Sequence, residues 1–288
     1  MTNENEKPRF RIEIPTMRRG IDNREAYRKF VEEGDKTTGA EPQTSQPVTF
    51  SNKSIVAHDY VQIPQSKKLI SKFEVQGYNN MNWQDTHFKL NENGFYMPTV
   101  PLFMEHFVNV VEAYKGKGKK PLFDANGNPI SKEEIKDIYL HLTKNHIAAY
   151  GQGTSLGAWT WLDAKFDEQN GSMNVSSEHR TFIDGNGNKT LQAGKIENLE
   201  KCLMTNSFSD LVFNKQGLST QTSATQQYTQ GENIYFWYPR DKAVARFGAG
   251  SGGAALDCAS YPGGVDSSLG VFAVLDGEAR GQKQGGAK

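Results

Sequence analysis

The chain has 288 residues with 33 basic and 33 acidic side chains, so its balanced charge gives no broad attraction to nucleic acid or to an anionic membrane surface. Aromatic residues make up 11% of the chain and the mean hydropathy is -0.66, which predicts a core combined with long polar loops. With only two cysteines, Cys202 and Cys258, a framework of several disulfides is excluded. Two free buried thiols are the favoured interpretation, and a single bridge is the alternative.

The N-terminal segment is polar. Residues 1–10 lack the apolar stretch of a secretory signal peptide, and no apolar run reaches the roughly 20 residues of a membrane helix. We therefore expect a soluble protein without membrane insertion, which could still reach a virion or cell surface by another route. Residues 1–50 favour an extended or partly disordered arm with one candidate helix at 24–33. The arm could join a homo-oligomer or remain a loose tail.

Ordered structure is expected from about Ile55. The β-branched and aromatic content of segments 54–63 and 69–78 is typical of strands. A helix is predicted to begin after Thr99 and to end at Gly116 and Gly118. Its buried face is expected from residues that recur at helical spacing, namely Phe103, Phe107, Val110, Val111 and Tyr114.

A hairpin and a second helix are predicted next. Asn126–Gly127 between short apolar runs is a strong hairpin signal. Ser131 followed by Glu134 forms a capping box that opens the second helix. Its buried face is expected to comprise Ile135, Ile138, Tyr139 and Leu142.

The second half of the chain reads mainly as short strands. Segment 159–166 alternates, with Thr160, Leu162, Ala164 and Phe166 forming an aliphatic face opposite Trp159, Trp161, Asp163 and Lys165. Segment 172–192 predicts a hairpin with its turn at 184–188, and 195–204 predicts a short third helix that buries Ile196, Leu199 and Leu203. Further strands are expected at 233–239, 243–247 and 269–275. Helices early and strands late predict an α+β fold, without alternating β-α units.

Residues 248–253 match the pattern G-x-G-x-x-G. A dinucleotide-binding loop needs a strand before the glycines and a helix after them, because the helix N-terminus holds the pyrophosphate. Here Pro262 follows too soon for a helix of normal length. We therefore interpret the match as an accident of composition and expect no cofactor.

Other chemical signatures are weak. The histidines, among them His58, His87, His106 and His179, show no metal-ligand spacing, and neither cysteine lies in C-x-x-C. We expect each histidine to lie on the surface or to be a hydrogen-bonded core residue, and we predict no metal site. No nucleophile–base motif of a known enzyme class is present, so we predict a non-enzymatic protein with no catalytic residues.

The C-terminal residues carry a resemblance. The stretch YFWYPRDKAVARFGAGSGGAALDCASYPGGVDSSLGVFAV, 235–274, resembles the variable region of the target proteins of diversity-generating retroelements, most like archaeal and viral members. The matching frame comprises Val244, Arg246, Phe247, Ala249, Ser251, Ala254, Leu256, Cys258, Pro262 and 268–271. The resemblance is specific over about the last fifty residues, weak over 78–213, and does not reach residues 1–50.

The resemblance implies a C-type lectin fold with two or three helices and a mostly antiparallel, irregular sheet. The lectin-like domain would cover 51–276, with a variable region at about 242–274 and a flexible tail at 277–288. In this family a reverse transcriptase rewrites template adenines, and the rewritten codons cannot encode Lys, Glu, Gln, Met or Trp. None of these five residue types occurs in 247–274, which agrees with the resemblance, although a glycine-rich loop could also lack them.

Alternation predicts which variable-region residues face outward. Phe247, Ala249, Ser251, Ala254, Leu256 and Cys258 are expected to face the core. The glycines are expected to result from diversification at solvent-facing positions, where they have little structural role. The predicted ligand-binding residues are Lys242, Gly248, Gly250, Gly252, Gly253, Ala255, Asp257, Ala259, Ser260, Tyr261, Gly263, Gly264 and Asp266. Tyr261 is the expected anchor, since hot spots are usually large side chains.

The resulting expectation is a ligand-binding display protein whose hypervariable surface recognises a protein or surface-glycan ligand on another cell or on a virus host. Receptor recognition by a viral protein and cell-surface adhesion both fit the resemblance. The alternatives are a structural virion or surface assembly protein and, more remotely, an enzyme of the formylglycine-generating kind. Calcium-dependent sugar binding is not expected, because E-P-N, Q-P-D and W-N-D are absent.

Overall fold

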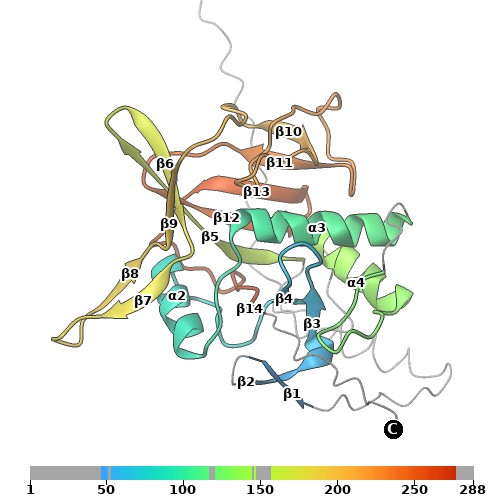
Figure 1. The fold of residues 1–288 in the computed structure, drawn as a ribbon. Coiled ribbons are helices and arrows are strands. Elements are labelled where there is room, and N and C mark those ends of the chain that lie inside the picture. The colour runs from blue at the N-terminus through green and yellow to red at the C-terminus, as the bar shows by residue number, and fades with distance from the viewer. Residues whose placement is uncertain (1–46, 51–52, 117–120, 145, 147–156, 277–288) are drawn as a thin grey trace, which may run out of the picture. The chain divides into compact units, whose positions relative to one another are not determined.

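A computed structural model describes residues 47–50, 53–116, 121–144, 146 and 157–276. These residues form a mixed α and β structure with three α-helices and a curled, mostly antiparallel sheet (Figure 1). The large sheet has seven strands in the order β10-β11-β13-β12-β5-β6-β9. Their bounds are β5 Trp159–Gln169, β6 Ser172–Ser177, β9 Lys195–Asn198, β10 Ser207–Asp210, β11 Asn233–Trp237, β12 Ala243–Gly250 and β13 Gly253–Ser260. Only the pair β11 and β13 is parallel within this sheet.

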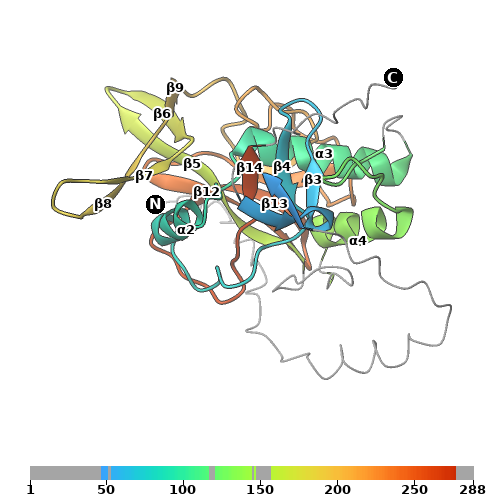
Figure 2. The ribbon, with the colours of Figure 1, turned by 60° about the horizontal axis from the view of Figure 1, so that its bottom comes forward.

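Three smaller sheets complete the strands. Strands β3 (Tyr60–Gln62), β4 (Lys68–Ser71) and β14 (Val274–Asp276) form one sheet in the order β14-β4-β3 (Figure 2). Strand β1 (Pro47–Phe50) pairs with β2 (Lys53–Val56), and β7 (Arg180–Ile183) pairs with β8 (Lys189–Gln192). The short helix η1 (Ala57–Asp59) links β2 to β3. The expected arm overlaps the described residues only at β1, and its candidate helix and the tail 277–288 lie outside them.

The main core lies between helix α3 (Val100–Lys115) and one face of the large sheet. The rings of Phe103 and Phe107 pack against Phe247 of β12 at centroid distances of 4.9 Å and 5.4 Å. All three side chains are fully buried, and each burial stabilises the fold by roughly 1.5–3 kcal/mol. Helix α4 (Lys132–Thr143) contributes Ile135, Ile138, Tyr139 and Leu142 to the same core, as predicted.

The predicted helix ends are mostly confirmed. Gly116 closes α3 in the left-handed conformation with φ 67°, where glycine avoids the Cβ clash. The hydroxyl of Ser131 accepts a hydrogen bond from the Glu134 amide at 3.2 Å at the start of α4. Gly118 lies outside the described residues. Tyr114 is not buried as expected: it is 41% exposed and stacks on Tyr139 at 4.0 Å.

Helix α2 (Trp83–Glu92) was not predicted from the sequence. It buries Trp83, Thr86, His87 and Leu90, which have regular helical spacing. Two of these four residues are polar, so the apolar pattern is interrupted and the mean hydropathy is low. Asn82 caps the helix by accepting a hydrogen bond from the Asp85 amide at 2.8 Å.

The predicted third helix at 195–204 is wrong. Residues 195–198 form the edge strand β9, which pairs with β6, and Ile196 is 66% exposed. Leu199 and Leu203 do pack against the main core, so their spacing reflects burial without helix formation. The expected turn at 184–188 is confirmed between β7 and β8. The predicted hairpin does not extend to residue 172, because β6 pairs with β5 and β9 and not with β7 or β8.

The last strand is shorter than expected, since only residues 274–276 are β14 and the preceding residues form single bridges such as Thr160 with Gly270. Among the described residues, no helix is both long and apolar enough to cross a bilayer.

Candidate functional site

The hairpin of β12 and β13 separates a buried side from an outward side. Phe247, Ala249, Ala254, Leu256 and Cys258 are at most 1% exposed and belong to the main core. This confirms the predicted inward frame, with one exception. Ser251 lies exposed in the two-residue turn between the strands, because the strands end at Gly250 and Gly253 and alternation no longer applies there. No helix follows the glycines within the described chain, which removes the structural basis of a nucleotide-binding loop.

The outward side of the hairpin continues onto three neighbouring strands, β11 and β10 on one side and β5 on the other. Phe208 of β10 lies opposite Tyr235 of β11, which lies opposite Ala255 of β13. Ala255 pairs with Gly248 of β12, which pairs with Trp159 of β5. Two small residues therefore lie between partly exposed aromatic side chains on either side. We call these five residues, together with Trp237 and Ala259, the display face.

Asp257 lies beside this face on β13, and its carboxylate, predicted to contact ligand, is held by internal hydrogen bonds. Its carboxylate accepts hydrogen bonds from Arg246 Nε at 3.0 Å, from the Ala259 amide at 2.9 Å and from Ser260 Oγ at 2.9 Å. The Arg246 guanidinium also lies 4.9 Å from the Trp159 ring centroid. Ser260 is only 6% exposed, so its prediction as a ligand contact is wrong. Its hydroxyl instead holds the Asp257 carboxylate.

The glycines of the hairpin have different roles. An ideal Cβ on Gly248 would lie 2.3 Å from the Trp159 ring, and one on Gly253 would lie 2.2 Å from the Tyr228 ring. Gly253 also has φ +96°, which other residues rarely adopt. Gly252 is different, because no described atom lies within 4 Å of its Cβ position. The expectation that all these glycines lack a structural role is therefore wrong for Gly248 and Gly253. Gly248 is also buried against the Trp159 ring, so its prediction as a ligand contact is wrong. Gly252 is open to substitution. Gly250 is partly exposed at the end of β12.

The loop after β13 presents the most exposed aromatic residue of the region. Tyr261 is 76% exposed, and the exposed Gly263 and the partly exposed Gly264 lie close beside it. Asp266 is exposed, but its carboxylate accepts hydrogen bonds from the amide and hydroxyl of Ser268 at 2.8 Å and 2.7 Å and so shapes the loop. Lys242 is exposed before β12 with φ 59°.

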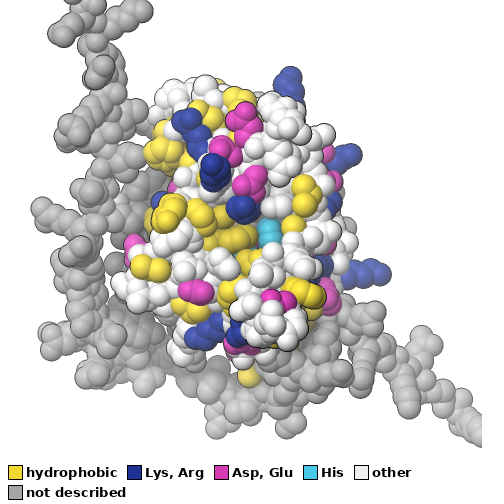
Figure 3. All heavy atoms as spheres, turned by 90° about the vertical axis from the view of Figure 1, so that its left-hand side faces the viewer, with side chains coloured by type: hydrophobic (Ala, Val, Ile, Leu, Met, Phe, Trp, Pro, Cys, Tyr) yellow, Lys and Arg dark blue, Asp and Glu magenta, His cyan; other side chains and the backbone are white. Residues whose placement is uncertain are grey.

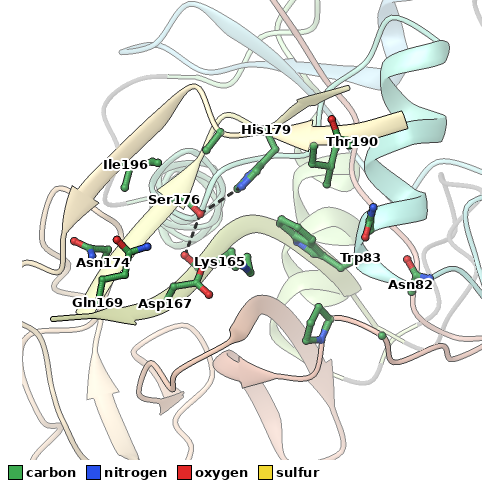
Figure 4. A pocket seen from close by; sticks show the side chains of 15 residues that line it. Asn82, Trp83, Lys165, Asp167, Gln169, Asn174, Ser176, His179, Thr190 and Ile196 are labelled. Atoms are coloured by element: carbon green, nitrogen blue, oxygen red, sulfur yellow. Dashed lines mark hydrogen bonds and ion pairs between the residues drawn. The ribbon is translucent and has the colours of Figure 1, made fainter. Parts of the chain in front are cut away.

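A pocket of about 460 Å³ lies next to this loop. Figure 3 shows its side of the molecule, where hydrophobic side chains line a hollow beside a histidine. Strands β5 and β6, the start of α2 and the segment at 190–196 form its walls, and Pro262 and Gly263 form part of its rim. In Figure 4 the polar groups at one end are Lys165, Asp167 and Ser176. The sequence did not indicate this pocket, because its walls come from segments up to about 180 residues apart.

A buried group of two histidines and one carboxylate lies beside the pocket. The His179 Nδ1 atom is 2.5 Å from Asp163 Oδ1, and His87 Nε2 is 3.6 Å from the same oxygen. Burial lowers the pKa of His87 to about 4, so its ring is neutral at neutral pH. Burial on its own would raise the pKa of Asp163, but the neighbouring His87 and His179 lower it overall. The sequence expectation of surface or satisfied core histidines is wrong for His87 and for His106 of α3, as none of their ring nitrogens has a hydrogen-bond partner among the described residues.

The two cysteines are both free thiols. Cys258 is fully buried and Cys202 is partly buried, as the interpretation of two unpaired thiols largely anticipated. Burial raises the pKa of Cys202 to about 11 and that of Cys258 well above its ordinary value. Both thiols are therefore protonated at neutral pH.

Comparisons with known proteins gave no match: no family model, curated protein or solved structure is similar to the chain at a significant level.

Proposed function

We propose that this chain is a non-enzymatic display protein with a C-type lectin fold, whose C-terminal surface binds a protein or a surface glycan. The observation that carries the proposal is the division of the β12–β13 hairpin. Its inward residues are at most 1% exposed, whereas the outward residues of β13, namely Ala255, Asp257 and Ala259, are partly exposed next to the aromatic residues of β11. A surface that varies its side chains without unfolding needs this separation of scaffold from contact residues.

The positions open to variation lie on the outward side and in the following loop. Gly252, Ala255, Ala259 and Tyr261 fill no part of the buried core. Phe208, Tyr235, Trp159 and Trp237 add a fixed aromatic border, of the residue type that binding surfaces prefer. Glycine and alanine bury little area, so we expect this variant to bind weakly, with Tyr261 as the main anchor.

The cysteines argue against one of the two alternatives, the enzyme. An enzyme of the formylglycine-generating kind needs reactive thiols, but Cys258 is fully buried and the pKa of each cysteine is raised by burial. A virion assembly protein would bury Tyr261 and the outer side of the hairpin against other subunits. The role of the partner, a receptor on a virus host or on a neighbouring cell, follows from the resemblance of 235–274 to retroelement target proteins.

Glycan and protein arrays probed with the purified chain test this proposal. Tyr261→Ala removes the anchor, and Val265→Ala is the matched control, since Val265 is 59% exposed in the same loop. The proposal expects ligands that bind the wild type and Val265→Ala at least tenfold more tightly than Tyr261→Ala. Ligands that bind all three proteins equally would contradict it.

A further inference from the structure

The group of His87, Asp163 and His179 brings together three separate parts of the fold. His87 lies on α2, Asp163 lies in the middle of β5, and His179 lies in the turn between β6 and β7. One donor atom from each residue lies within 4.8 Å of the other two, and all three residues are buried. This convergence does not depend on the proposed binding function of the display face.

His87 is the member that a hydrogen-bond network does not explain. It is 0% exposed, and neither ring nitrogen has a hydrogen-bond partner within the described part of the chain. A buried polar group without a partner is unfavourable. Its Nε2 atom lies 3.6 Å from Asp163 Oδ1, so one ring nitrogen faces the interior of the group beyond ordinary hydrogen-bond distance.

We propose that these three residues bind a divalent transition-metal ion, with Zn²⁺ as the best fit. Two imidazole nitrogens and one carboxylate oxygen are ordinary zinc ligands, and three protein ligands leave one position for water. Ligands in a tetrahedral zinc site lie about 3.3–3.5 Å apart, given metal–ligand distances of about 2.0–2.1 Å. The His87–Asp163 separation of 3.6 Å already matches. The closer His179–Asp163 pair, at 2.5 Å, would have to widen by roughly 1 Å through a side-chain shift to take an ion between the two atoms.

The surroundings orient the ligands as in known metal sites. The His179 amide donates a hydrogen bond to Asp163 Oδ2 at 3.0 Å, and His179 Nε2 lies 3.4 Å from Ser176 Oγ. With Nδ1 bound to the ion, Nε2 would carry the proton and donate a hydrogen bond to Ser176 Oγ, which would fix the ring orientation. The Trp83 ring meets His87 and His179 edge-on at 4.4 Å and 5.0 Å and forms an apolar wall.

The pocket supplies the route for the ion and for its water ligand. His179 and Trp83 line this pocket (Figure 4), and Asp163 lines a second, smaller hollow between β4, α3 and Arg180. A bound ion would therefore attach α2 and the β6–β7 turn to the central strand β5. It would also place a coordinated water beside the wall of the pocket.

Metal titration of the EDTA-treated full chain tests the proposal. Calorimetry with ZnCl₂ should give one site per chain, and CoCl₂ should produce the visible absorption bands of tetrahedral cobalt. His87→Gln should weaken Zn²⁺ binding at least tenfold and abolish the cobalt bands. His106→Gln is the matched control, because His106 is also 1% exposed and lacks hydrogen-bond partners among the described residues, but it lies on α3 and is not part of the group. CaCl₂ should not compete.

Two results would overturn the proposal: no stoichiometric zinc binding by the wild type, or equal binding by His87→Gln and His106→Gln. X-ray absorption of the cobalt-loaded wild type needs no variant and covers the case in which His87→Gln does not fold. It should show two imidazole ligands and oxygen ligands, and a spectrum without imidazole scattering would refute the site.

Discussion

Gly248→Ala should destabilise the protein even though Gly248 lies on the outward side of a stretch proposed to vary. The new Cβ would lie 2.3 Å and 2.4 Å from two ring carbons of Trp159, well inside the roughly 3.5–4.0 Å of a favourable carbon contact. The indole must move, although it packs against a smaller buried cluster that includes Trp161 and Val244 and lies under the Arg246 guanidinium. Overpacking of this kind lowers the free energy of unfolding by about 1–3 kcal/mol.

Urea unfolding of two glycine variants, of Trp159→Ala and of the Trp159→Ala/Gly248→Ala double variant measures this effect. Gly252→Ala is the matched control, since no described atom lies within 4 Å of its Cβ position, and its free energy of unfolding should stay within about 0.5 kcal/mol of the wild type. In a Trp159→Ala background the added methyl group has space, so Gly248→Ala should then have an effect below about 0.5 kcal/mol. Equal effects of Gly248→Ala and Gly252→Ala, or an unchanged effect without the indole, would refute the reasoning.

Three further predictions concern single residues. Tyr261→Ala should change the free energy of unfolding by less than about 0.5 kcal/mol, because the side chain is 76% exposed; a large loss in urea unfolding would show that Tyr261 is a packing residue. Asp257→Ala should destabilise the protein by about 1 kcal/mol, because Arg246, Ser260 and the Ala259 amide lose a half-buried acceptor, and thermal unfolding with no shift would argue against this. Burial lowers the pKa of His106 to about 3 from 6.5. The unfolded chain therefore takes up a proton that the folded chain does not, and stability should fall by up to about 1.4 kcal/mol per pH unit between about pH 6.5 and 3. His106→Leu should flatten this slope, and an identical slope in both proteins would contradict the assignment.

Local signals predicted the elements that have strong local causes. Helix α3 has a regular apolar face and a glycine end, and α4 has its capping residue, so both were predicted almost at their observed bounds. Alternation also placed Phe247, Ala249, Leu256 and Cys258 correctly in the core. These features depend on neighbours within a few residues in the sequence.

The errors arise where distant contacts decide the structure. Segment 195–198 became an edge strand because β6 offers it a partner, which helical spacing of apolar residues does not reveal. Helix α2 buries a threonine and a histidine, so its buried face did not look apolar.

The structural roles of the hairpin glycines and the convergence of the His–Asp group could not be predicted from the sequence. Gly248 and Gly253 are required by the rings of Trp159 and Tyr228, which come from other segments. Asp163 and His179 are 16 residues apart, and His87 reaches them from α2. No spacing rule for metal ligands covers such a set.

Selection from a library tests the central claim most directly. A library diversified at Gly252, Ala255, Ala259, Tyr261 and Gly263 is displayed on yeast and selected for binding to lysozyme as a model protein. The control library has the same number of positions diversified within the inward frame of Phe247, Ala249, Ala254, Leu256 and Cys258, whose side chains are at most 1% exposed. The account predicts specific binders from the first library, with unfolding midpoints close to that of the wild type, and mainly unfolded chains from the second. Loss of folding throughout the first library, or folded binders at equal frequency from both, would contradict the proposal that the outward side of β12 and β13 is a display surface.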